Sequence, residues 1–254
     1  MLAKDLTVFV LAHPDDEVLF WPLISRTPPN RLALLFVTDG SANGTMEPDV
    51  RVLETQRMLA GLGIDPAVAL FLGRDKGIRD GNLHNDIDKA WAALSSWADA
   101  RGRIGEIYTH AWEGGHADHD VCHALSIALA HRVTPSRVGQ VACYRRPDSG
   151  IAPYSLLDPM AANGVPEAFK MTGAERRAMA KSVTSYPSQW KSWVGLGPPL
   201  LTRLALSSSF PVQPVSAKRL AERPHERPLL YEMRAKLPFA AVSTAISNFL
   251  AHQG

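Results

Sequence analysis

Short apolar runs alternate with helical patterns along the first 145 residues. Residues 6–12 and 31–37 are almost wholly apolar and rich in β-branched and aromatic side chains, as expected for strands buried on both faces of a parallel sheet. The full pattern predicts strands at residues 6–12, 31–37, 68–72, 104–109 and 138–144, with helical stretches at 49–62, 83–101 and 121–131. Strands that alternate with helices imply right-handed crossovers. We therefore expect an α/β protein with a Rossmann-like, mostly parallel sheet flanked by helices.

The pattern loosens after residue 145. Residues 145–166 contain four prolines, and residues 195–214 are rich in Gly, Pro and Ser. The remaining periodicity predicts a helix at 173–185, a short strand at 229–233 and a closing helix at 239–250. No internal repeat, low-complexity segment or clean linker divides the sequence. We expect one domain over residues 1–254, made of an α/β core at 1–145 and a loop-rich C-terminal extension at 146–254.

The composition is that of an ordinary globular protein. Hydrophobic residues make up 46% of the 254 residues, charged residues 20%, and the formal net charge is +2, which is too small to indicate a nucleic-acid partner. Two cysteines, Cys122 and Cys143, cannot build a disulfide framework or a cysteine-type zinc site, and they favour a reducing compartment. No apolar run reaches the length of a membrane span, and the N-terminus lacks the order of a signal peptide. We expect a cytoplasmic protein without a membrane span.

A cluster of polar side chains follows the first predicted strand. Residues 12–17 read Ala-His-Pro-Asp-Asp-Glu, and Pro14 ends the strand because it lacks a backbone donor. One histidine and three carboxylates therefore lie at the carboxyl end of a central strand, where open α/β sheets bind ligands. A divalent metal would compensate this charge, with His and one carboxylate as ligands and another carboxylate as a base. The alternative is a solvated acidic helix start in which Asp15 and Asp16 only cap the helix.

A second polar loop has the same position relative to its strand. Residues 115–119 read Gly-His-Ala-Asp-His; they follow the strand at 104–109 and open a helix. Two loops at the carboxyl ends of parallel strands can meet above the sheet. The Gly-rich dinucleotide fingerprint is absent after the first strand, because residues 13–17 occupy its place. The sequence therefore favours a metal centre over a nucleotide site.

Both loops resemble the signatures of a known family. Residues 12–17 are similar to the first signature of the PIG-L/LmbE-like zinc-dependent N-acetyl-sugar deacetylases, and residues 116–119 to the second, with Ala117 at its variable place. The resemblance implies three zinc ligands, His13, Asp16 and His119. It makes Asp15 the general base and His116 the second catalytic group, which stabilises or protonates the tetrahedral intermediate. Asp118 would orient a histidine, or cap the following helix, or do both.

Weaker similarities extend to substrate contacts. By the same resemblance Arg51 and Asp75 are expected to contact sugar hydroxyls, although a surface ion pair or cap is an equal alternative. Trp112 lies in the same loop as His116 and is expected to line the pocket. Glu17 is expected to be structural, since three ligands and a base already complete such a site.

His119 and His123 raise a competing interpretation. They stand at i and i+4 on one helix face, the spacing of the His-Glu-x-x-His metalloproteases. Asp120 occupies the place where that motif needs Glu, and a third ligand would have to come from elsewhere. We therefore interpret His123 as a packed or hydrogen-bonded helix histidine.

The resemblance implies hydrolysis of the acetamide of an N-acetylated amino sugar, such as an N-acetylglucosamine-type glycoside or glycoconjugate, with release of acetate and a free amine. The expected cofactor is Zn²⁺, although a His/Asp/His site also suits Fe²⁺, Co²⁺ or Ni²⁺. The expected partner is the small-molecule sugar. Two alternatives stay open: a non-catalytic, metal-containing sugar-binding protein on the same fold, and an amidase that acts on a related glycoconjugate amide.

Overall fold

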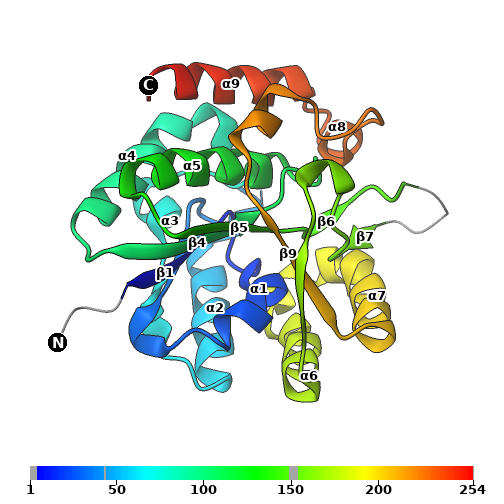
Figure 1. Ribbon diagram of the computed structural model, residues 1–254. Coiled ribbons are helices and arrows are strands. Elements are labelled where there is room, and N and C mark those ends of the chain that lie inside the picture. The colour runs from blue at the N-terminus through cyan, green and yellow to red at the C-terminus, as the bar shows by residue number, and fades with distance from the viewer. Residues whose placement is uncertain (1–4, 43, 149–153, 254) are drawn as a thin grey trace.

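A seven-stranded sheet forms the centre of the computed structural model, which describes residues 5–42, 44–148 and 154–253 (Figure 1). Its strands are β1 (Leu6–Leu11), β2 (Leu32–Phe36), β3 (Ala69–Leu70), β4 (Ile104–His110), β5 (Arg137–Val141), β8 (Glu167–Lys170) and β9 (Ser209–Pro214). Their order is β3-β2-β1-β4-β5-β9-β8. Strands β1 to β5 pair in parallel, β9 runs antiparallel to β5, and β8 runs antiparallel to β9. The predicted α/β class with a mostly parallel sheet is confirmed.

Helices cover both faces of this sheet (Figure 1). One layer contains α4 (Ile87–Asp99), α5 (Ala117–Val133) and α9 (Phe239–Ala251), and the other contains α1 (Glu17–Ile24), α2 (Pro48–Gly61), α6 (Gly173–Ser182) and α7 (Trp190–Leu206). In β1, Val8 and Val10 pack toward the first layer, while Phe9 and Leu11 pack toward the second. This double burial explains why β1 reads as a continuous apolar run rather than an alternating one.

The C-terminal extension is more regular than the sequence predicts. The stretch at 195–214, expected to be loop-rich, forms most of α7 and all of β9, which joins the central sheet. Helix α7 contains Pro198 and Pro199, but its buried side chains Trp193, Leu200 and Leu204 hold it against the core. Tertiary packing therefore outweighs the poor helix propensity of this segment. The helices expected at 173–185 and 239–250 are confirmed as α6, with a 3-10 turn after it, and α9.

The strand predicted at 229–233 is wrong, because residues 230–234 form helix α8 (Leu230–Arg234). Its first turn is closed by Glu232, whose carboxylate accepts the Leu229 backbone N–H at 2.8 Å. Two further short elements are α3 (Leu72–Lys76) and the hairpin of β6 (Tyr144–Arg145) and β7 (Ser155–Leu156). Residues 1–4, where we expect no signal peptide, lie outside the described residues. Among the helices that are described, none is long and apolar enough to cross a bilayer.

Candidate active site

The two polar loops lie at the same edge of the sheet. Residues 12–16 connect β1 to α1, residues 111–116 connect β4 to α5, and β1 and β4 are parallel neighbours. A cavity of about 480 Å³ opens at this edge. At the sheet edge its lining includes the polar side chains of His13, Asp15, Asp16, Arg51, Asp80 and His116. Side chains separated by about 100 residues along the chain therefore face one space.

The three predicted metal ligands lie together. The carboxylate of Asp16 is 3.4 Å from Nδ1 of His13 through Oδ2, and 3.2 Å from Nε2 of His119 through Oδ1. One ring nitrogen each from His13, His116 and His119 also falls within a mutual distance of 4.8 Å. His116 thus stands beside the predicted ligand set as well as in the cavity.

His119 supplies the test of whether these residues fit a metal. Its ring is fully buried, and neither ring nitrogen makes a hydrogen bond within the described part of the chain. Burial lowers the pKa of His119 to about 4, so the neutral imidazole keeps a lone pair at neutral pH. A buried polar atom without a partner is costly, and coordination would satisfy it. Two imidazoles and a carboxylate are a donor set that fits a divalent metal.

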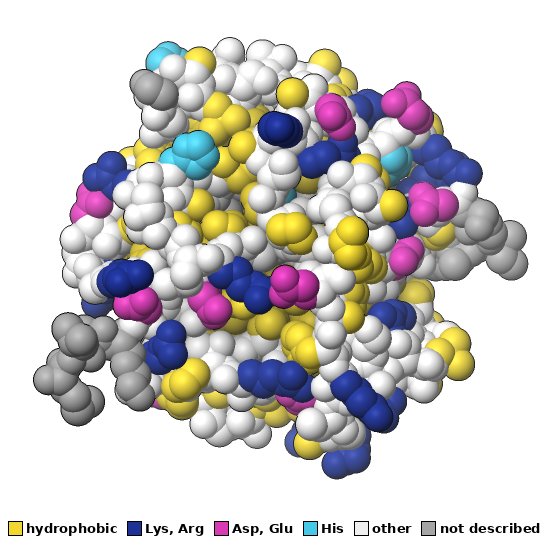
Figure 2. Space-filling model, in the orientation of Figure 1, with side chains coloured by type: hydrophobic (Ala, Val, Ile, Leu, Met, Phe, Trp, Pro, Cys, Tyr) yellow, Lys and Arg dark blue, Asp and Glu magenta, His cyan; other side chains and the backbone are white. Residues whose placement is uncertain are grey.

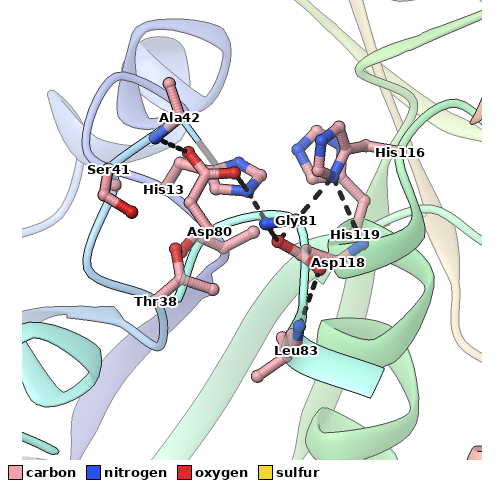
Figure 3. Close-up of polar contacts among 12 residues, drawn as sticks. His13, Thr38, Ser41, Ala42, Asp80, Gly81, Leu83, His116, Asp118 and His119 are labelled. Atoms are coloured by element: carbon pink, nitrogen blue, oxygen red, sulfur yellow. Dashed lines mark hydrogen bonds and ion pairs between the residues drawn. The ribbon is translucent and has the colours of Figure 1, made fainter. Parts of the chain in front are cut away.

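His13 is held by carboxylates on its other side (Figure 3). Its Nε2 lies 3.0 Å from Oδ2 of Asp118 and 3.2 Å from Oδ1 of Asp80. A carboxylate on the second nitrogen is the usual support of a metal-binding histidine. Burial lowers the pKa of His13, but the surrounding acids outweigh it and raise the pKa well above its usual value. A proton on His13 therefore competes with a metal.

Asp118 orients His13 and also connects two loops. Its carboxylate accepts the backbone N–H groups of Gly81 at 2.6 Å and Leu83 at 3.1 Å (Figure 3). The alternative that Asp118 caps α5 is wrong. The cap is His116, whose Nδ1 accepts the Asp118 backbone N–H at 3.2 Å.

This capping bond sets the chemistry of His116. An Nδ1 that accepts a hydrogen bond leaves the proton of the neutral ring on Nε2. Burial lowers the pKa of His116 to about 4, and His13 lowers it further in the same direction. His116 is therefore a neutral hydrogen-bond donor at the cavity wall, rather than a group that changes charge near neutral pH.

Asp15 has a strained backbone at the cavity. Its φ is +117°, a region that residues other than glycine rarely adopt. Its backbone N–H is held by Oε2 of Glu17 at 2.8 Å, and its Oδ1 lies 2.6 Å from Nη2 of Arg51. Burial raises the pKa of Asp15 to about 7, although Arg51 opposes this shift. The side chain is thus fixed next to Asp16 with a pKa suited to taking up a proton.

Glu17 belongs to a buried chain of hydrogen bonds behind Asp15. The hydroxyl of Tyr186 donates to Oε1 of Glu17, and it also contacts the Thr55 hydroxyl at 3.1 Å. All three side chains are almost fully buried. Tyr186 and Thr55 come from outside the two loops and carry no sequence motif, so the sequence alone does not predict them.

Arg51 lines the cavity, but its guanidinium is already bound by protein groups. Only 2% of the residue is exposed, and its guanidinium donates to the backbone carbonyls of Pro14 and Gly40 and pairs with Asp15 and Asp80. Asp80 is a residue that sequence reasoning missed. Burial opposes its ionisation, but His13 outweighs this and lowers its pKa below the usual carboxyl range. Its one sequence signal is the Asp-Gly turn at 80–81.

Two predicted substrate contacts do not line the cavity. The Asp75 side chain is 62% exposed on α3 and pairs with Arg74. Trp112 is fully buried in the core, its Nε1 donates to the Glu222 carbonyl at 3.1 Å, and its ring lies 6.1 Å from that of Phe239. These placements correct both expectations, because Asp75 faces solvent and Trp112 packs beneath the C-terminal helices.

The C-terminal extension completes the cavity. It contributes two cations and several apolar side chains, namely Lys191, Arg234, Tyr154, Trp193, Leu196, Leu230 and Leu237. Tyr144 also lines the cavity, with its ring 5.2 Å from that of His119. Gly115 makes this approach possible, since a Cβ there would lie 1.9 Å from the Tyr144 carbonyl oxygen. The cavity therefore has a polar end at the sheet and a largely apolar wall from the extension.

The competing histidine pair is arranged differently. His123 Nδ1 lies 3.0 Å from the carbonyl oxygen of His110, to which it donates. Within the described residues it belongs to none of the groups whose ligand atoms converge, whereas His119 belongs to two. His110 is also occupied, since its Nε2 accepts the Ala12 N–H at 3.0 Å and its Nδ1 lies 3.2 Å from Sγ of Cys143. The metalloprotease arrangement is not present here.

Comparison with known proteins relates part of the chain to one family. Residues 8–130, slightly under half of the chain, match the profile of the PIG-L family, described as GlcNAc-PI de-N-acetylase. The match agrees with the resemblance of the two polar loops to the PIG-L/LmbE-like deacetylases. A search of curated proteins gave no match.

Several solved structures share the fold. A triple mutant of a deacetylase of the teicoplanin biosynthetic pathway (Orf2*T) has a TM-score of 0.58 at 16% identity, over 84% of this chain and 100% of that one. The conserved protein TT1542 from Thermus thermophilus gives 0.57 at 20%, over 83% and 94%. The A40926 pseudoaglycone deacetylase Dbv21 gives 0.57 at 17%, over 84% and 99%. At these identities the similarity concerns the fold.

Proposed function

We propose that this chain, which belongs to the PIG-L family over residues 8–130, is a metal-dependent hydrolase that removes the acetyl group from an N-acetylated amino sugar. The observation that carries the proposal is the placement of Asp15. It adjoins the metal-binding candidate Asp16, faces the cavity, and is held in a strained conformation by Glu17 and Arg51. A protein that only stores a metal or binds a sugar has no need for a second, fixed carboxylate.

His13, Asp16 and His119 would hold the metal, with Zn²⁺ as the first candidate and Fe²⁺, Co²⁺ or Ni²⁺ as alternatives. When bound, the metal supplies a Lewis acid for the acetamide carbonyl and lowers the pKa of a water. Asp118 and Asp80 keep His13 in place through its Nε2. We assign Arg51 to positioning Asp15 and Asp80, since its guanidinium is occupied by protein groups.

Two side chains then carry out the proton and charge steps. Asp15 takes a proton from the water that attacks the acetamide carbon, and its pKa of about 7 suits this role near neutral pH. The Nε2–H of His116 donates to the carbonyl oxygen as negative charge develops there. As the C–N bond breaks, the proton on Asp15 passes to the departing nitrogen. The products are acetate and a free amine.

The test is a hydrolysis assay that follows both products. Metal-loaded protein is incubated with N-acetylglucosamine and its glycosides, and acetate and free amine are measured with and without a chelator. We expect equimolar products that the chelator abolishes. Asp15→Asn should retain the metal and lower kcat by about 10²- to 10⁴-fold. Asp75→Asn is the matched control, because its side chain is exposed outside the cavity, and it should keep the wild-type rate.

Each alternative has its own outcome in this assay. If the protein binds the acetylated sugars but releases neither product from any of them, it is a sugar-binding protein and not a hydrolase. Release of a free amine together with an acid other than acetate would favour an amidase that acts on a related glycoconjugate amide. Loss of the metal in Asp15→Asn would show that Asp15 is a metal ligand and contradict its assignment as the base.

A further inference from the structure

One face of helix α7 exposes large apolar side chains to solvent. Trp190 is 59% exposed, Val194 67% and Leu201 48%. These residues stand four and seven positions apart, so they form one stripe along the helix. The neighbouring face of α7, with Trp193, Leu200 and Leu204 buried, already anchors the helix to the core. A helix that is apolar on its outer face as well marks an interaction site.

The chain segment that contains this stripe carries charged residues of one sign. From residue 176 to residue 221 the chain contains no Asp or Glu, although the whole protein carries 25 acidic residues against 27 basic ones. The basic residues of this stretch are Arg176, Arg177, Lys181, Lys191, Arg203, Lys218 and Arg219. Arg177, Lys181 and Lys191 are exposed. In Figure 2 several Lys and Arg side chains gather at the lower right, in the region of α6 and α7. We call this surface of α6 and α7 the basic-apolar face.

The basic-apolar face adjoins the mouth of the cavity. Lys191, Ser192, Trp193 and Leu196, all from the first two turns of α7, line the cavity. Trp190 and Val194 belong to the same two turns and point to solvent instead. Whatever covers the stripe therefore lies next to the cavity entrance.

The charge decides between the candidate occupants. A second copy of this chain, bound by a symmetric contact, would bring two cationic surfaces together, which is unfavourable. An anionic lipid surface offers phosphates for the Lys and Arg side chains and an apolar layer for the stripe. Tryptophan at the boundary and basic residues beside it are typical of helices that lie in a membrane interface.

We propose that the basic-apolar face adsorbs to an anionic lipid surface, with Trp190, Val194 and Leu201 entering the headgroup layer and Arg177, Lys181 and Lys191 contacting lipid phosphates. This peripheral attachment goes beyond the hydrolase proposal and does not depend on it. It places the cavity entrance at the lipid surface.

Vesicle co-sedimentation of the full chain tests the proposal. The probes are vesicles of phosphatidylcholine alone and of phosphatidylcholine mixed with phosphatidylglycerol. We expect binding to the mixed vesicles only, weakened by high salt. The triple variant Trp190→Ser, Val194→Ser, Leu201→Ser should bind at least about tenfold more weakly than the wild type, because each substitution removes an apolar side chain that would be buried in the lipid layer. Arg177→Gln with Lys181→Gln should weaken binding in a salt-dependent way.

Two controls separate the face from general surface effects. Val165→Ser removes an apolar side chain that is 85% exposed outside α7, and Lys89→Gln removes an exposed charge on α4. Both should bind like the wild type. Failure of the wild type to bind mixed vesicles, or equal binding by the triple variant with a retained circular dichroism spectrum, would overturn the proposal. So would a concentration-dependent dimer in ultracentrifugation that the triple variant abolishes without any vesicle binding.

Discussion

Asp15 combines an unfavourable backbone angle with a functional position, and the residues that hold it explain how the strain persists. A φ of +117° costs free energy unless surrounding contacts fix it. Glu17 accepts the Asp15 N–H, and Glu17 is in turn held by the buried hydroxyl of Tyr186. The sequence places Glu17 beside the base, but only the structure connects it to a tyrosine 169 positions away.

Tyr186→Phe should lower kcat by about 10- to 100-fold with little change in KM or metal content, since outer partners of catalytic groups typically have effects of this size. The variant removes only the hydroxyl that fixes Glu17. Tyr108→Phe is the control, because Tyr108 is also a buried tyrosine but lies on β4 in the apolar core. Steady-state kinetics of both variants give the answer. A wild-type kcat in Tyr186→Phe, together with a lowered melting temperature, would reduce this tyrosine to a purely structural role.

His119→Ala should abolish stoichiometric metal binding, because it removes a buried imidazole whose nitrogens have no hydrogen-bond partner among the described residues. His123→Ala should retain the metal, since that ring donates to the His110 carbonyl. Metal content after dialysis, measured by mass spectrometry on folded protein, distinguishes the two variants. The reverse result would restore the helix-pair metalloprotease interpretation.

At the level of elements, the start of α6 shows how a charge pair fixes the extension to the core. Thr172 caps the helix by accepting the Glu175 N–H at 3.1 Å, and the Glu175 carboxylate accepts the Thr172 N–H at 2.6 Å. Arg26, which follows α1, donates to both oxygens of Glu175 at 2.6 and 2.9 Å. The hydrogen bonds from Arg26 lower the pKa of Glu175 from 4.5 to about 2.

This depressed pKa predicts a defined loss of stability in acid. The stabilisation from ionised Glu175 is complete above the usual pKa of 4.5 and disappears as the pH falls toward 2. Glu175→Gln keeps the capping geometry, since Gln also serves at this position, but removes the charge. The difference in unfolding free energy between wild type and variant should therefore be present at neutral pH and shrink at about pH 3.

Urea unfolding at both pH values measures this difference. Glu167→Gln is the control, because its side chain is 75% exposed and pairs with Arg137 on the surface, where such pairs contribute little. A Glu175→Gln difference that is equal at the two pH values would show that the charge of Glu175 does not support α6.

Elements with a strong physical constraint are predictable from the sequence, and those fixed by tertiary contacts are not. Strand β1 is buried on both faces and is therefore almost wholly apolar. The polar loop after it gathers one histidine and three carboxylates in five residues. In contrast, α7 forms despite two internal prolines because its buried side chains have partners in the core. Asp80 and Tyr186 are single polar residues without a catalytic motif, and only folding brings Asp80 to His13 and Tyr186 to Glu17.

At the scale of the whole molecule, the extension is part of the structure built by residues 1–145. Strand β9 pairs with β5 in the central sheet, and α9 packs on α4 and α5, with Phe249 5.8 Å from Trp91. Trp112 also donates to a carbonyl of the extension. Two regions that share a sheet and a hydrophobic core are expected to unfold as one cooperative unit. We therefore propose that the chain is one cooperative domain.

Phe249→Ala tests this proposal, because the ring is 1% exposed and belongs to the extension. Loss of a buried aromatic ring typically costs about 3–5 kcal/mol. In one cooperative domain the variant shifts unfolding followed by tryptophan fluorescence and by far-ultraviolet circular dichroism to the same lower urea concentration. Four of the six tryptophans lie within residues 1–145, so fluorescence reports mainly on the core. Both unfolding curves are measured in the presence of a chelator, so that bound metal does not stabilise the folded state. If the dichroism transition moves while the fluorescence transition stays, the extension unfolds independently, and the α/β core must be stable without the helix that covers it.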